Sequence, residues 1–163
     1  MVKRMPTYPQ NSIRLMIEDS AKALLLTIRD KINDVYKTLG RGYSESVYQR
    51  ALSVEFQMAN LRHDMEVTMS VPYKGHVVGH VRSDIILRTS PSVILETKAT
   101  GTSLKPEERW QLSRYLKLQD VSLGVLVNFP QSGAAGPLIE FFVYSDNEFY
   151  AYNVDTGYAV LVA

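Results

Sequence analysis

Three side chains capable of acid–base or metal chemistry lie on two neighbouring apolar stretches of this chain. Asp84 lies within His76–Arg88, and Glu96 and Lys98 lie toward the end of Ser92–Thr100. Both stretches have the apolar, β-branched composition of strands, and the run before Glu96 predicts central burial. Because side chains alternate along a strand, we expect Glu96 and Lys98 to share one face.

The two carboxylates predict a metal site. If the turn between the strands covers residues 89–91, Asp84 lies opposite Glu96. Two carboxylates form a hard oxygen site suited to Mg²⁺ or Mn²⁺, which polarises a phosphoryl oxygen and lowers the pKa of a bound water. The ammonium of Lys98 would orient that water. The alternative interpretation is a cross-strand ion pair that contributes only about a few tenths of a kcal/mol.

Two predicted helices carry further polar side chains toward these strands. Gln111 and Tyr115 are four residues apart in the predicted helix Lys105–Gln119, so they share one helix face. Glu45 and Tyr48 are three apart at the start of another helix. Capping of the helix by itself explains Glu45, and core packing by itself explains either tyrosine.

Cations give the helix after the third strand a positive character. Arg109 and Arg114 are flanked by Lys105 and Lys117. The default interpretation is a solvated helix face, and the functional alternative is positioning of substrate phosphates by the two arginines.

Hydrophobic periodicity predicts the remaining elements. In the second helix, Val47, Ala51, Val54 and Met58 form the expected core stripe. The resulting order α-α-β-β-β-α-β-β-β predicts an α/β sandwich around a central mixed sheet. Helices are expected at 12–39, from about 44 to 60 and at 105–119, and strands at 67–71, 76–88, 92–100, 122–129, 138–144, 148–154 and 158–162.

The composition excludes some classes of protein but does not indicate any particular reaction. The chain has 163 residues, 18 Lys and Arg against 17 Asp and Glu, and a net charge of +1. This balance argues against binding of nucleic acid by bulk charge alone. The absence of cysteine excludes disulfides and cysteine-based zinc sites and favours an intracellular protein. No apolar run is long enough to span a membrane, so no membrane partner is expected. We expect a flexible N-terminal arm over residues 1–11 and a single domain over 12–163.

An ordered set of motifs resembles a known family. Gly42–Tyr48 (GYSESVY) closely resembles the signature of the GxxExxY proteins, a branch of the PD-(D/E)XK nuclease superfamily. The resemblance covers roughly residues 12–130 and implies the restriction-endonuclease-like fold, an αβα sandwich with a central mixed β-sheet. Its further segments are Tyr73–Gly75, Arg82–Asp84, Ile94–Lys98, Gln111–Lys117 and Gly124–Phe129.

The resemblance implies roles for the strand residues. Asp84 and Glu96 match the metal-binding acids of the superfamily, and the backbone carbonyl of Thr97 often completes that site. Lys98 matches the catalytic lysine that positions or activates the attacking water. Ser83 departs from the family pattern, because the superfamily usually has proline before the aspartate.

The helix residues also have counterparts in the family. Glu45 matches an acidic residue that supports a metal or its water. Gln111 and Tyr115 match a Gln-x-x-x-Tyr element of nucleases related to bacterial recombination exonucleases, where they orient the lysine and contact the substrate backbone. Tyr48, Arg109 and Arg114 are the further candidate substrate contacts.

The implied function is a nuclease that uses Mg²⁺ or Mn²⁺ to hydrolyse phosphodiester bonds, in DNA more than in RNA. One alternative is a catalytically silent nuclease fold that serves as a nucleic-acid-binding or structural subunit of a larger complex. A small-molecule phosphohydrolase is a third possibility without a supporting motif. Residues 138–163 lie beyond the matched motifs, and their strands are expected to extend the sheet, form a homodimer or contact a partner.

Overall fold

The computed structural model describes residues 10–101, 103–133 and 135–162, so residues 1–9 of the predicted arm lie outside the described part. Within these ranges, no helix is long and apolar enough to cross a membrane. The helices are α1 (Asp19–Leu39), α2 (Glu45–Met58) and α3 (Pro106–Gln119), and the strands are β1 (Ser12–Arg14), β2 (His63–Tyr73), β3 (His76–Leu87), β4 (Val93–Lys98), β5 (Leu123–Asn128), β6 (Leu138–Ser145), β7 (Glu148–Tyr152) and β8 (Tyr158–Leu161).

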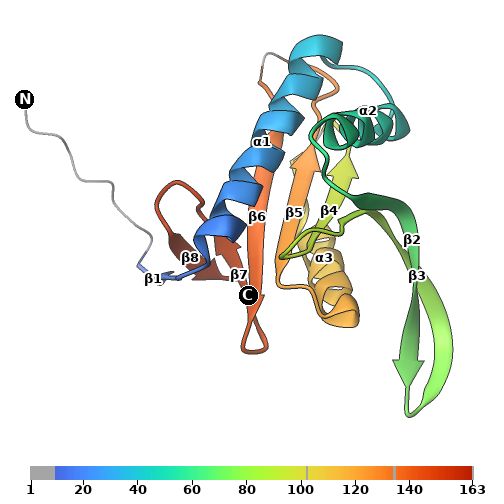
Figure 1. Cartoon of the computed structure of the whole chain (residues 1–163), viewed down its shortest axis with the longest axis vertical. Helices are drawn as coiled ribbons and strands as arrows, with labels where there is room; N and C mark the ends of the chain where they lie inside the picture. Colours follow the sequence, from blue (N-terminus) through green and yellow to red (C-terminus); the bar gives the residue numbers. More distant parts are fainter. Residues whose placement is uncertain (1–9, 102, 134, 163) are drawn as a thin grey trace, which may run out of the picture.

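One mixed sheet of eight strands organises the molecule (Figure 1). Its order is β1-β8-β7-β6-β5-β4-β3-β2, with β4 and β5 parallel and the other neighbouring strands of the described chain antiparallel. The helix α3 lies between β4 and β5 in the sequence, as a parallel crossover requires. The last three strands therefore extend the sheet, which was one of the outcomes expected for residues 138–163.

Helices cover both faces of the sheet and create two hydrophobic cores. The helices α1 and α2 pack on one face, and α3 packs on the other (Figure 1). The strand β4 divides its side chains between the two cores, because Leu95 faces α1 and α2 whereas Ile94 faces α3. This arrangement confirms the predicted αβα sandwich with a central mixed sheet.

The N-terminal helix is shorter than its sequence pattern predicts. Residues 12–18 were expected to be helical, but Ser12–Arg14 pairs with β8 and α1 begins only at Asp19. The backbone N–H of Leu15 also donates to the carbonyl oxygen of Gly157 at 3.0 Å. Hydrogen bonds to a strand distant in sequence therefore outweigh the local helical periodicity.

The predicted core stripe of the second helix is wrong. Val54 and Met58 are 53% and 75% exposed, and the buried face of α2 instead carries Tyr48, Leu52 and Phe56. Both stripes have helical spacing, so periodicity does not distinguish them. The buried stripe removes more apolar area from water because it contains two aromatic rings and a leucine.

A glycine in β5 sets the distance between α3 and the sheet. A Cβ atom at Gly124 would lie 3.0 Å from the Cδ2 atom of Leu112, which is buried on α3. Such a contact is shorter than the normal separation of two carbon atoms. The missing side chain therefore lets α3 approach the central strands.

We predict that Gly124→Ala lowers the free energy of unfolding by about 1 kcal/mol, because the added methyl group overpacks the interface with Leu112. Urea denaturation measures this change. Gly79→Ala is the matched control, since nothing lies within 4 Å of a Cβ atom there. Equal stability of both variants would contradict the packing argument.

Candidate active site

The strands β3 and β4 separate where the two predicted metal-binding acids lie. Their ladder includes Ile85 opposite Leu95, a register that places Asp84 opposite Glu96. Beyond the pair of Ile85 with Leu95, backbone N–H groups of the two strands donate to side-chain carboxylates instead of to backbone carbonyl oxygens. The backbone N–H of Asp84 donates to Oε1 of Glu96 at 3.1 Å, and the N–H of Thr97 donates to Oδ2 of Asp84 at 2.8 Å. The structure thus brings the two acids together through side-chain bonds between the strands.

Glu96 is a carboxyl group almost completely removed from water, with only 3% of its surface exposed. Burial raises its pKa well above the ordinary value, and the negative charge of Asp84 raises it further. Hydrogen bonds from Ser83 and from the N–H of Asp84 oppose this shift. The pair therefore carries a strong electrostatic penalty when both carboxyl groups are ionised.

Ser83 has a direct role that sequence reasoning missed. Its buried hydroxyl donates to Oε1 of Glu96 at 2.9 Å. Proline at this position would offer no such donor. The signal available in the sequence was a hydroxyl next to the predicted metal-binding aspartate.

Thr97 contacts Asp84 through its side chain as well. Its hydroxyl donates to Oδ2 of Asp84 at 3.1 Å. This contact forms because the separated strands let Asp84 reach the edge of β4. Thr97 thereby holds Asp84 with both its backbone and its side chain, and the proposed use of its carbonyl as a metal ligand remains a prediction.

Lys98 and Glu45 lie in the same electrostatic environment as the acid pair. Burial raises the pKa of Glu45, and the charge of Asp84 raises it further, whereas Lys98 lowers it. The described residues provide no ion-pair partner for Lys98. Glu45 comes from the first turn of α2, and the side chain of Gln49 donates to it at 3.3 Å.

A buried asparagine fixes the backbone that follows Lys98. Asn128 accepts from the N–H of Thr100 at 3.0 Å and donates to its carbonyl oxygen at 3.2 Å. The N–H of Phe129 donates to the carbonyl oxygen of Lys98 at 2.8 Å. The sequence signal for Asn128 was a polar residue closing an otherwise apolar strand.

Gln111 and Tyr115 approach the carboxylates from α3. Burial raises the pKa of Tyr115, the charges of Glu96 and Asp84 raise it further, and a hydrogen bond with Gln111 lowers it. Tyr115 is therefore close enough to both acids to be affected by their charges. Asp84, Glu96, Lys98, Glu45, Tyr115 and Gln111 converge in this way from two strands and two helices.

Tyr48 does not join this group as a substrate contact. Its ring is completely buried and stacks on Phe129 with ring centroids 4.2 Å apart. Its hydroxyl donates to the carbonyl oxygen of Gly40 at 2.7 Å. The predicted substrate contact is thus corrected to a packing role, because no surface of Tyr48 remains accessible.

Arg109 forms an ion pair with a carboxylate on a strand of the sheet. Its guanidinium makes two hydrogen bonds of 2.7 Å with the carboxylate of Glu140 on β6, which raise the pKa of Arg109. Such a bidentate pair holds the guanidinium against β6, and the predicted phosphate contact of Arg109 stays a prediction. Arg114, in contrast, is exposed and has no ion-pair partner in the described part of the chain.

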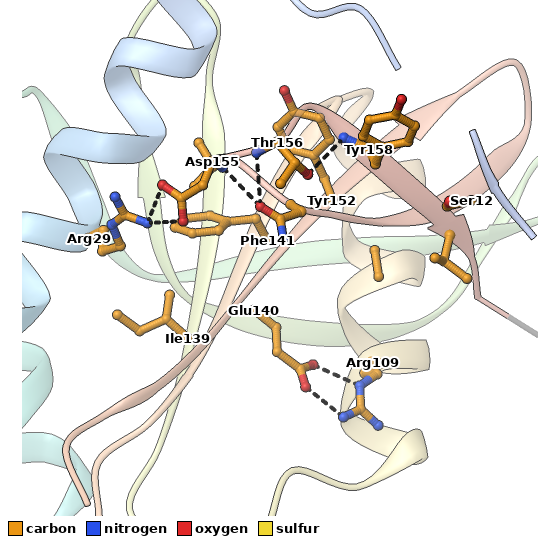
Figure 2. Close-up of a pocket in the computed structure, with 14 residues that line it drawn as sticks. Ser12, Arg29, Arg109, Ile139, Glu140, Phe141, Tyr152, Asp155, Thr156 and Tyr158 are labelled. Carbon is orange, nitrogen blue, oxygen red and sulfur yellow. Dashed lines mark hydrogen bonds and ion pairs between the residues drawn. The ribbon is translucent and has the colours of Figure 1, made fainter. Parts of the chain in front are cut away.

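The Arg109–Glu140 pair lines a separate cavity of about 590 Å³. Figure 2 shows this pair on one side of the cavity and the pair of Arg29 with Asp155 on another. None of the acid-pair residues lines this cavity. It is therefore distinct from the site formed by Asp84 and Glu96.

The donor set suits a hard divalent cation through two carboxylates rather than three. Among the described residues, no three Asp, Glu, His or Cys side chains lie close enough to form a metal-binding group. The predicted role of Glu45, as a support for the metal or its water, stays a prediction. Mg²⁺ keeps several waters and commonly uses one or two carboxylates, and a dication would relieve the repulsion between these two acids.

Comparison with known proteins assigns the family. The sequence matches the family model of the PD-(D/E)XK nuclease superfamily over residues 22–138. This chain belongs to the PD-(D/E)XK nuclease superfamily. The matched segment includes all the residues that converge at the acid pair, from Glu45 to Tyr115, and the fold is the restriction-endonuclease-like αβα sandwich.

The comparisons with solved structures and with curated proteins give less information about this chain. A solved structure titled "Crystal structure of SSO0001" is 24% identical, with a TM-score of 0.44. The similar region covers 58% of this chain and 48% of that chain, so this chain matches about half of that protein's length. The comparison with curated proteins gives no match.

We predict that Glu96→Gln stabilises the metal-free protein at pH 8 but not at pH 4. Because the pKa of Glu96 is raised, the folded state binds its proton more tightly than the unfolded chain. Glu96 therefore costs stability as pH rises above the ordinary carboxyl pKa, and glutamine removes this cost.

Thermal unfolding in EDTA at several pH values measures the effect. Glu148→Gln, at an exposed glutamate on β7, is the control and should show no comparable dependence on pH. A variant with Glu96→Gln that is less stable than the wild type at pH 8 would contradict the electrostatic argument.

Proposed function

We propose that this superfamily member is a divalent-metal-dependent nuclease of the GxxExxY branch, which hydrolyses phosphodiester bonds in DNA more than in RNA. The single observation that supports this most strongly is the acid pair. Asp84 is held beside the buried Glu96, near a lysine without an ion-pair partner among the described residues, at a geometry that a dication would stabilise.

Asp84 and Glu96 would hold Mg²⁺ or Mn²⁺, with the backbone carbonyl of Thr97 as a further oxygen donor. The bound cation would supply Lewis acidity toward a phosphoryl oxygen of the substrate. Ser83 and the hydroxyl of Thr97 hold the two carboxylates in place, so that their arrangement is established before the substrate binds.

Lys98 would orient the attacking water, and the surrounding helices would set its position. Glu45 lies in the field of both Lys98 and Asp84, and its raised pKa suits a group that exchanges a proton with that water. Gln111 and Tyr115 would position the lysine from α3, and Arg114 would contact a phosphate. These roles follow the family pattern and are supported by the convergence of the same residues.

The cellular setting and the assembly are part of the same proposal. An intracellular location follows from the cysteine-free composition and from a nucleic-acid substrate. A homodimer or a larger complex through the C-terminal strands would enlarge the footprint of a protein with a net charge of only +1. No membrane partner is proposed.

We predict cleavage of DNA in the presence of Mg²⁺ or Mn²⁺ that is lost in Lys98→Ala and Asp84→Asn. Loss of the water-orienting ammonium or of a metal ligand should reduce the rate by about 10²-fold or more. Gel analysis of a panel of single-stranded, double-stranded and branched DNA and RNA measures it. Lys37→Ala, at an exposed lysine on α1, should keep full activity, and wild-type activity in either active-site variant would refute the assignment.

We also predict that Mg²⁺ or Mn²⁺ raises the melting temperature of the wild type. A ligand that binds only the folded state at 100 times its Kd stabilises it by about 2.7 kcal/mol. Asp84→Asn should show little of this shift. Absence of the shift together with absence of cleavage would favour the catalytically silent, subunit-like alternative, and hydrolysis of a small phosphate ester alone would favour the phosphohydrolase.

A further inference from the structure

A groove of about 490 Å³ lies between α3 and the hairpin formed by β2 and β3. Its volume is within the range of about 300–1,000 Å³ that is typical of small-ligand sites. The hairpin and α3 contribute its lining, which consists of Val71, Pro72, Val81, Gln111, Arg114, Tyr115, Lys117 and Leu118.

The groove exists because the hairpin reaches beyond the sheet and rotates. The strand β4 pairs with β3 only at Ile85–Leu87, whereas β2 and β3 stay paired out to Tyr73 and His76. The hairpin consequently projects from the body of the protein (Figure 1). Within the described ranges no third strand pairs with its outer part, and α3 packs against the hairpin on that side.

The rotation of the hairpin is seen in its side chains, because residues expected on one face of the sheet pack into two different cores. Met65 and Met69 are four residues apart and should share a face, yet Met65 packs with the core under α1 and α2 and Met69 with the core under α3. Between them Glu66 has a φ of 51°, and its pair with Asp84 is missing from the ladder. The outer half of the hairpin therefore turns apolar side chains toward α3.

The chemistry of the groove combines apolar walls with a cationic rim. Val71, Val81 and Leu118 are partly buried apolar side chains. Arg114 and Lys117 are exposed and form no ion pair with the described residues. A flat, apolar-faced ring attached to an anion matches this combination, and a nucleotide has both parts.

The groove shares two residues with the proposed active site. Gln111 and Tyr115 line it, and both are candidate residues of that site. A ligand in the groove would therefore contact two residues of the proposed site, while its phosphates contact the cationic rim.

We propose that this groove holds an unstacked nucleobase of a single-stranded nucleic acid, with Arg114 and Lys117 on its flanking phosphates. The inference rests on the proposed nuclease function and specifies its substrate. Bases in a duplex must be unpaired and unstacked to enter such a groove, at a cost of about a few kcal/mol. Single-stranded or frayed segments are therefore the preferred substrates.

The test measures binding separately from cleavage, with wild-type protein in EDTA. The probe is a single-stranded DNA oligonucleotide that contains 2-aminopurine and a terminal fluorophore, and its duplex is the comparison. We expect a change in 2-aminopurine fluorescence on binding and a Kd at least about tenfold lower for the single strand. Tighter binding of the duplex would overturn the proposal.

Substitutions inside and outside the groove test where the base binds. Val81→Glu introduces a charge into the groove and should raise the Kd for the single strand at least about tenfold. Val77→Glu, at a 60% exposed position near the hairpin tip and outside the groove, is the matched control and should leave the Kd unchanged. An unchanged Kd in Val81→Glu, or equal losses in both variants, would overturn the proposal.

Surface variants keep the test decisive if Val81→Glu fails to fold. The double change of Arg114→Ala with Lys117→Ala should weaken binding and reduce its salt dependence by about two phosphate contacts. Arg50→Ala with Lys37→Ala, both exposed positions on α2 and α1, controls for net charge. Equal effects of the two double variants would overturn the proposal.

The outcomes also separate this inference from the nuclease assignment. Single-strand binding that requires the groove, without cleavage in any metal, would refute the nuclease and keep the groove. Metal-dependent cleavage with no preference for single strands and no effect of Val81→Glu would keep the nuclease and refute the groove.

Discussion

Burial of Glu96 beside Asp84 is the constraint around which this molecule is arranged. A carboxylate with 3% of its surface exposed, facing another carboxylate, is costly to ionise. Donors from Ser83 and from the backbone of Asp84 offset part of this cost at Glu96, and both polar groups of Thr97 donate to Asp84. Those donors are available only because β3 and β4 separate at this point. The separation of the two strands and the stabilisation of the two carboxylates therefore depend on each other.

The central strands and the two helix layers position the acid pair. The β4–β5 pair is buried on both faces, Asn128 fixes the backbone after Lys98, and Gly124 lets α3 approach closely. The first turn of α2 brings Glu45 from the opposite layer. The residues of the site consequently come from four elements, and displacement of any one of them would change the field at the acid pair.

The proposed substrate surface shares α3 residues with the candidate site. The projecting hairpin and the exposed face of α3 together supply apolar walls and cations, while Gln111 and Tyr115 belong to both the groove and the site. This division places the proposed bond-breaking groups on strands and the proposed recognition groups on a helix and a hairpin. A net charge of +1 is compatible with nucleic-acid binding when the cations are concentrated in this way.

The sequence by itself determined the layered fold, the order of the site residues and the register of Asp84 against Glu96. Each of these follows from alternation, local turn length or an ordered motif, all of which act over short distances along the chain. Only the tertiary structure decided which apolar stripe of α2 is buried, that Tyr48 is a packing residue and that Arg109 pairs with Glu140. Those outcomes depend on partners distant in sequence, whose packing area and charge no local pattern encodes. The same reason explains why the hairpin's rotation, which creates the groove, was visible only in three dimensions.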